Sequence, residues 1–86
     1  MLKKGEIMIN AYILLNIQPG KTENVIKEIR KIEDIAKISI VTGEYDVVVR
    51  TQIKSLDGLL KVTDKIQMIK GVNKTTTQVI EKEITL

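Results

Sequence analysis

Apolar and polar residues alternate with period two along residues 7–17. One face of such a segment would carry only apolar side chains: Ile7, Ile9, Ala11, Ile13, Leu15 and Ile17. The opposite face would be mixed, with Met8, Asn10, Tyr12, Leu14 and Asn16. This period predicts a β-strand that buries one face only. Gln18, Pro19 and Gly20 predict its end.

Two later segments have the period of an amphipathic helix. In residues 21–35 the apolar stripe is formed by Val25, Ile26, Ile29 and Ile32, and Thr22 is the expected N-cap. In residues 55–71 we expect Ser55 to be the N-cap and Gly71 to mark the stop. The predicted buried stripe of this second helix is Leu56, Leu59, Leu60, Thr63 and Ile66.

Three further segments predict strands. Residues 36–42 are expected to point Ala36, Ile38 and Ile40 inward, and residues 45–53 follow after a tight turn at Gly43 and Glu44. The short spacing predicts an antiparallel hairpin. Residues 72–80 are rich in β-branched side chains and predict the last strand.

The order β-α-β-β-α-β predicts an α+β, ferredoxin-like fold, a four-stranded antiparallel sheet with two helices on one face. Right-handed crossovers place the first and third strands in the middle. The second strand then pairs with the third, and the fourth with the first. The face away from the helices carries Met8, Tyr12 and Leu14, which is too apolar to face water. We therefore expect two chains to pack these faces together.

Length and composition narrow the protein class. The 86 residues make one domain, 1–86, with no cysteine to staple it, so oligomerisation is the remaining source of buried apolar surface. No apolar run is long enough to span a membrane, and the start lacks the apolar core of a signal peptide. We expect a cytoplasmic protein. Abundant Ile and Lys favour a thermophile as the source.

The sequence lacks several of the residue types that enzymes most often use in catalysis. The chain has no His and no Cys, which removes the usual general base, thiolate catalysis and the commonest metal ligands. Ser39 and Ser55 are expected to be a strand residue and a cap. Glu44 and Asp46 could act as an acid–base pair, but no second polar cluster surrounds them in the sequence. We therefore expect no enzyme, no catalytic residue, no metal and no cofactor.

The segment TGEYD, residues 42–46, allows two interpretations. In the structural one, Gly43 supplies a positive φ, Glu44 is exposed, Tyr45 packs across strands and Asp46 binds its own hairpin backbone. In the functional one, the carboxylate and backbone amides bind a zwitterion together with threonine hydroxyls. The candidate hydroxyls are those of Thr75, Thr76 and Thr77. Because the topology separates these strands, we expect the two groups to meet across chains.

Three segments carry a resemblance to a known family: VTGEYDVVVR at 41–50, AYILLNIQPGK at 11–21 and GVNKTTTQVI at 71–80. The chain resembles the effector-binding (RAM) domain of the leucine-responsive regulator, or Lrp/AsnC, family. The resemblance implies dimers formed by facing sheets, commonly four dimers in a ring (an octamer), and amino-acid effectors bound between dimers. The implied ligand-binding residues are Gly43, Glu44, Tyr45, Asp46, Thr75, Thr76 and Thr77.

Full-length members of that family carry an N-terminal helix-turn-helix, which does not fit in the few residues before the first strand. We therefore expect a stand-alone effector module for transcription regulation that does not bind specific DNA itself. The alternative is a ligand-free assembly partner that co-oligomerises with full-length Lrp/AsnC regulators. An enzyme of the dimeric α+β barrel type shares the topology, and a direct nucleic-acid binder is disfavoured because the basic residues are dispersed.

Overall fold

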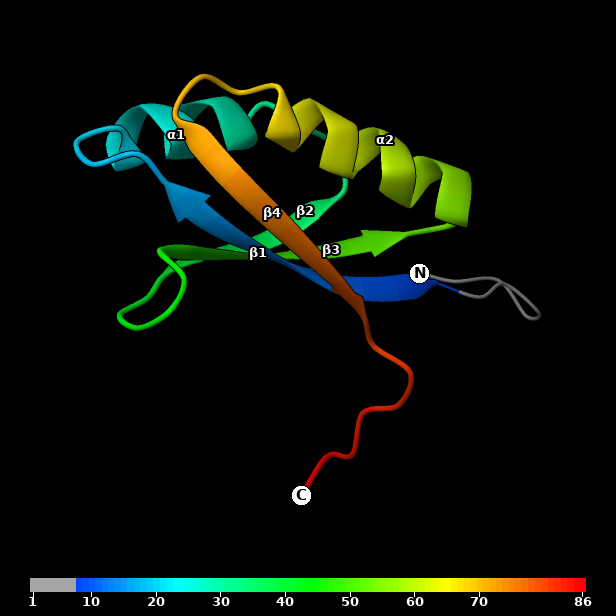
Figure 1. The fold of residues 1–86 in the computed structure, drawn as a ribbon. Helices are drawn as coiled ribbons and strands as arrows, with labels where there is room; N and C mark the ends of the chain where they lie inside the picture. The colour runs from blue at the N-terminus through cyan, green and yellow to red at the C-terminus, as the bar shows by residue number, and fades with distance from the viewer. Residues whose placement is uncertain (1–7) are drawn as a thin grey trace.

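The sheet has both of its helices on one side (Figure 1). The computed structural model describes residues 8–86. In these residues the elements follow in the order β1 (Ile9–Ile17), α1 (Thr22–Ile29), β2 (Ile35–Ile40), β3 (Val47–Ile53), α2 (Leu56–Gln67) and β4 (Val72–Val79). The strand order of the described sheet is β2-β3-β1-β4, and all neighbours are antiparallel. This confirms the ferredoxin-like fold and the central place of the first and third strands.

The hydrophobic core lies between the sheet and the helices. β1 and β3 contribute alternate residues to it, as the period of two predicts, and Ile13, Leu15 and Val49 are completely buried. The helices add Val25, Ile29, Leu59, Val62 and Ile66. Ile7, which was predicted to belong to the first strand, lies outside the described residues.

The two helix starts differ. Ser55 is the N-cap of α2, and its hydroxyl accepts a hydrogen bond of 3.1 Å from the amide of Gly58, as predicted. The predicted cap Thr22 is wrong, because Thr22 is the first helical residue and Lys21 occupies the cap position without a side-chain bond. α1 also ends at Ile29, earlier than the pattern suggested, and Ile32 packs against the core from the following loop.

The predicted buried stripe of α2 was partly wrong. Leu59 and Ile66 are buried, but Leu56 and Leu60 are 60% and 61% exposed, and Val62 takes the core position that the prediction missed. Leu59, Val62 and Ile66 follow the spacing i, i+3, i+7, which fits one helical stripe as well as the predicted set does. The orientation of α2 on the sheet selected between them.

β2 also departs from the expected pattern. A register shift between Ile35 and Lys37 leaves Ala36 exposed, and Ile35 packs toward the core in its place. Ile38 packs against the core as predicted. Ile40 was expected to point inward but is 70% exposed at the sheet edge. β2 ends at Ile40 and β3 begins at Val47, so a loop of residues 41–46 replaces the predicted tight turn at Gly43 and Glu44.

Candidate functional site

The sheet face away from the helices, here called the open face, combines apolar and polar side chains. Leu14 of β1 is paired with Val48 of β3 on one side and with Thr76 of β4 on the other. All three are only half-buried. One pair further along β1, Tyr12 lies between Arg50 and Gln78. The expected apolar character of this face is therefore confined to its centre.

Arg50 connects the open face to the segment that follows β4. Its guanidinium lies 5.6 Å from the centre of the Tyr12 ring and donates a 2.7 Å hydrogen bond to the carboxylate of Glu83. The hydrogen bond to Glu83 raises the pKa of Arg50 above its ordinary value. The contact with Tyr12 is a cation–π interaction. These bonds hold the C-terminal segment beside the open face.

Asp46 anchors the loop of residues 41–46 to β1. Its amide donates to the carbonyl of Leu15 at 2.8 Å, and its carbonyl accepts from the amide of Val41 at 3.0 Å. Its carboxylate Oδ2 accepts from the amide of Ile17 at 2.7 Å. The carboxylate thus extends the ladder between β1 and β3 ahead of Val47, the first residue of β3, and a charged acceptor makes that bond strong.

The structure therefore corrects one part of the turn interpretation. Asp46 was expected to bond its own hairpin backbone, yet its side chain bonds the neighbouring strand β1. Asn16, which the sequence did not single out, adds a second tie, because its Nδ2 donates to the carbonyl of Glu44 at 2.8 Å. Its place on the mixed face of the alternating segment was the available signal. Tyr45 lies in the loop and not in a strand, and it is half-buried.

The anchored loop presents backbone donors to solvent. Within residues 8–86, the amides of residues 42–45 form no hydrogen bond with the protein. Thr42, Gly43 and Glu44 are exposed. Gly43 has φ +140, a conformation that side chains with a Cβ rarely adopt. Such a cluster of unpaired N–H groups can accept an anion.

The three threonines of β4 do not lie on one face of the sheet. Thr76 pairs with Leu14 and shares the open face, whereas Thr75 and Thr77 pair with Leu15 and Ile13, whose side chains lie on the helix side. Thr75 and Asp46 both border Leu15, from opposite sides of β1. Two strand spacings, about 10 Å, therefore separate them. A single chain brings these residues to one end of the sheet but not into contact.

Other classes of site find no support in the described residues. No three acidic, His or Cys side chains gather there as a metal ion would require. Neither of the helices in residues 8–86 has the length and apolar character needed to cross a bilayer. Lys74, one of the dispersed basic residues of the sequence, pairs with Asn16 and adds a positive charge at the same end of the sheet.

Comparison with known proteins shows which proteins this chain is similar to. Over 74 residues the chain is 32% identical to the HTH-type transcriptional regulator FL11 of Pyrococcus furiosus, which covers 86% of this chain and 49% of the relative. The chain thus spans about half the length of this curated relative. Among solved structures, the protein TTHA0845 from Thermus thermophilus is similar with a TM-score of 0.83 and 25% identity, covering 91% of this chain and 99% of that one.

A more distant likeness concerns the fold alone. The transcriptional regulator NMB0573 from Neisseria meningitidis, solved with L-methionine, has a TM-score of 0.81 at 22% identity and covers 91% of this chain and 53% of that chain. The Lrp/AsnC ligand binding domain family matches residues 10–85, which confirms the resemblance seen in the sequence. The FL11 proteins of Pyrococcus furiosus and Pyrococcus abyssi are transcriptional regulators, in agreement with the expected lack of catalysis. The chain belongs to the Lrp/AsnC ligand binding domain family of transcription regulators.

Proposed function

We propose that the loop of residues 41–46 binds a free amino acid and that binding changes the assembly of the domain. The observation that carries this proposal is the anchoring of Asp46 to Ile17, which fixes a loop whose amides at residues 42–45 are unpaired and whose residues 42–44 are exposed. These amides suit a carboxylate. The second carboxylate oxygen of Asp46 and the side chain of Glu44 suit an ammonium group. The match to the Lrp/AsnC ligand binding domain family supports a small-molecule ligand, and NMB0573, which shares the fold, was solved with L-methionine.

The proposed pocket is completed by a second chain. Because β1 separates Asp46 from the threonines of its own chain, Thr75, Thr76 and Thr77 contribute only across an interface. The half-exposed Leu14 and Val48 support dimers formed through the open faces. A ligand held between chains shifts the assembly equilibrium as far as it prefers one assembly state. Dimers, and octamers built from them, are the assemblies to look for.

The first test is thermal unfolding of the purified protein with each of the twenty amino acids at millimolar concentration. A ligand present at about 100 times its dissociation constant stabilises the folded state by about 2.7 kcal/mol. For a domain of this size that corresponds to a shift of roughly ten degrees or more. A selective shift identifies the effector. The absence of any shift, for a protein shown to be oligomeric, contradicts the proposal.

Asp46→Asn is the sharper variant. The amide oxygen of asparagine can still accept from Ile17, so the anchor remains while the negative charge is lost. Asp46→Ala would remove the hydrogen bond from Ile17 together with the negative charge, and the loop would lose its anchor. We expect Asp46→Asn to abolish the amino-acid effect with little change in ligand-free stability. Glu33→Gln, an exposed acid remote from the loop, is the matched control. Equal affinity in Asp46→Asn and wild type would exclude Asp46 from the pocket.

A second candidate is a ligand-free assembly partner for full-length Lrp/AsnC regulators. It is favoured by the exposed Leu56 and Leu60, which lie one turn apart on α2 and offer an apolar contact outside the open face. Size-exclusion chromatography with a full-length regulator should then yield a mixed assembly without any amino acid. Leu60→Glu should prevent it. Self-association alone, with no mixed species, contradicts this candidate.

A further inference from the structure

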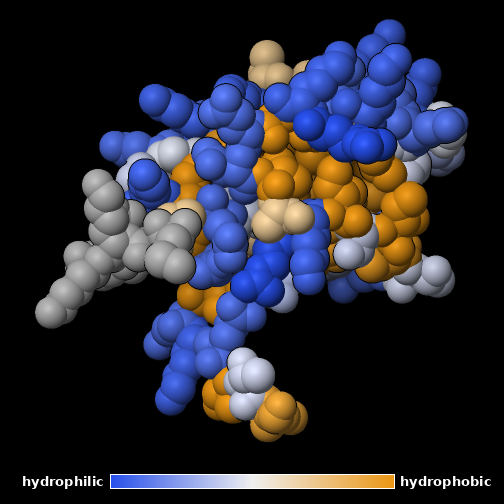
Figure 2. Space-filling model, turned by 180° about the vertical axis from the view of Figure 1, so that it is seen from behind, coloured by the Kyte–Doolittle hydropathy of each residue, from blue (hydrophilic) through white to orange (hydrophobic). Residues whose placement is uncertain are grey.

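A groove runs between α1 and the edge strand β2, on the side of the molecule away from β4. It has a volume of about 440 Å³. From behind, the molecule shows a broad apolar patch beneath the polar surface of the helices (Figure 2). The groove is lined by Ile26, Arg30, Ile32, Ile35, Ala36, Lys37, Ile38 and Ile40. Its volume and apolar lining are in the range of small-molecule sites, about 300–1,000 Å³.

The local structure explains why the groove stays open. α1 has 8 residues against 12 in α2, and it ends before it can cover the edge strand. Asp34, with φ +68, turns the chain into β2, and the register shift at Ala36 directs Ile35 and Ile38 toward α1. Ile26, Ile32 and Ile38 are partly buried against the core, whereas Ile40 is exposed. The isoleucines thus form a fixed apolar wall with one open side.

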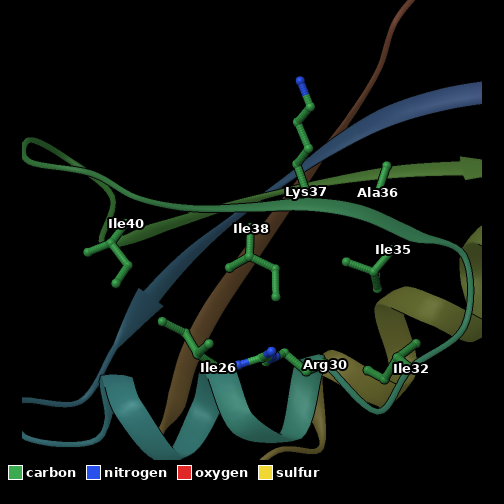
Figure 3. Close-up of a pocket in the computed structure, with 8 residues that line it drawn as sticks. All are labelled: Ile26, Arg30, Ile32, Ile35, Ala36, Lys37, Ile38 and Ile40. Atoms are coloured by element: carbon green, nitrogen blue, oxygen red, sulfur yellow. The ribbon is translucent and has the colours of Figure 1, made fainter.

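One charged group faces this wall. Figure 3 shows Ile35, Ile38 and Arg30 directed into the space between β2 and α1, whereas Lys37 and Ala36 point to the other side of β2. Within residues 8–86 the salt bridges join Lys31 to Glu28 and Arg50 to Glu83. Arg30 therefore has no carboxylate partner in the described chain. A guanidinium beside five isoleucines is an arrangement that a carboxylate with an aliphatic tail would complement.

The charge pattern disfavours a zwitterion. A second hollow along α1 shares Ile26, Arg30 and Ile40 with the groove. Its charged lining residues are Glu23, Lys27 and Arg30, and Glu23 lies nearest the start of the helix. Glu23 precedes Arg30 by seven residues, so about 10 Å of helix separates them. An amino acid carries its two charges on neighbouring atoms and cannot reach both residues. Its ammonium group would instead lie beside Arg30.

We propose that this groove binds a small aliphatic monocarboxylate, with Arg30 holding the carboxylate and the isoleucines of α1 and β2 covering the tail. The groove shares no lining residue with the loop of residues 41–46, which begins just after Ile40 at the groove's edge. The ligand of the groove lacks the ammonium group that the loop is suited to bind. The site therefore distinguishes des-amino acids from amino acids. Each methylene added to the tail should strengthen binding by up to about fourfold while the groove has room.

The test is NMR of protein labelled at the isoleucine δ1 methyl groups, titrated with hexanoate. The methyl signals of the groove isoleucines should shift, while those of Ile13 and Ile66 in the core should not. Matched ligands are hexylamine and norleucine, which should cause no shift in the groove. The series butanoate to heptanoate should bind progressively tighter.

Two variants assign the contacts. Arg30→Gln should weaken hexanoate binding at least tenfold, and the exposed position of Arg30 makes loss of the fold unexpected. Lys31→Gln is the control, because it removes the same charge from the adjacent residue, which pairs with Glu28. Ile40→Ser, at an exposed position, should reduce the gain per methylene.

Three results would overturn the proposal. The first is equal binding of hexanoate and hexylamine. The second is equal loss of affinity in Arg30→Gln and Lys31→Gln. The third is groove methyl signals that change with protein concentration and ignore hexanoate, which would assign the groove to a second copy of the chain. The amino-acid proposal is tested separately, by thermal unfolding and by Asp46→Asn, so failure of the hexanoate titration leaves that proposal to its own test.

Discussion

The two faces of the sheet differ although they are made from the same strands. On β1, Ile13 is completely buried under the helices, and its neighbour Leu14 is half-exposed on the open face. On β3, Thr51 is completely buried and its neighbour Arg50 is half-exposed. The helix side is closed by one chain, whereas the open face is left incomplete. We propose that the closed face provides stability and that the open face provides association.

The largest effect is expected at Ile13→Ala. The side chain is 0% exposed, and its truncation leaves a cavity among packed neighbours. We expect a loss of about 2–5 kcal/mol in the free energy of unfolding. Urea denaturation measures it directly. A loss below about 1 kcal/mol would show that the helix side is less tightly packed than its burial indicates.

The matched change on the open face is Leu14→Thr, which keeps a β-favouring residue but removes apolar surface. We expect association to weaken by about tenfold or more, equal to about 1.4 kcal/mol. The unfolding free energy of the dilute monomer should change by less than about 1 kcal/mol. Sedimentation over a dilution series separates the two quantities. Unchanged association would remove the open face from the interface.

A smaller effect is expected at Thr51→Val. The Thr51 hydroxyl donates to the carbonyl of Asp34, which also accepts from the amide of Gln52 at 3.2 Å. Because that second bond remains, we expect a loss of only about 0.5–1.5 kcal/mol. Thr51→Ser, which retains the hydroxyl, should preserve this hydrogen bond. If the Ser variant is weaker than the Val variant, the lost methyl contact outweighs the hydrogen bond.

The smallest effect is expected at Glu83→Gln on the open face. Arg50 and Glu83 form an exposed pair, and such pairs contribute little to folding. The urea midpoint should stay unchanged, while the NMR signals of the Tyr12 ring should move as Arg50 is released. A clear drop in midpoint, removed by high salt, would mean that the C-terminal segment stabilises the sheet.

The element order was predictable because period two and period 3.6 are local properties of the chain. The alternation in residues 7–17 identified Ile13 and Leu15 as core residues, and Ser55 was correctly assigned as a cap. The family resemblance also followed from short segments, each of which covers one strand and the loop beside it. In the candidate site, TGEYD drew attention to Asp46, but neither the bond to Ile17 nor the part played by Asn16 could be read from spacing.

What the sequence determined by itself was the set of strands and helices, their order and the apolar face of each central strand, because these depend on neighbours within a few residues. The tertiary structure decided which stripe of α2 is buried, where β2 shifts register and how the loop of residues 41–46 is held. Those outcomes depend on contacts between distant segments. Asp46 and Ile17 are 29 residues apart, and only the pairing of β1 with β3 brings them together.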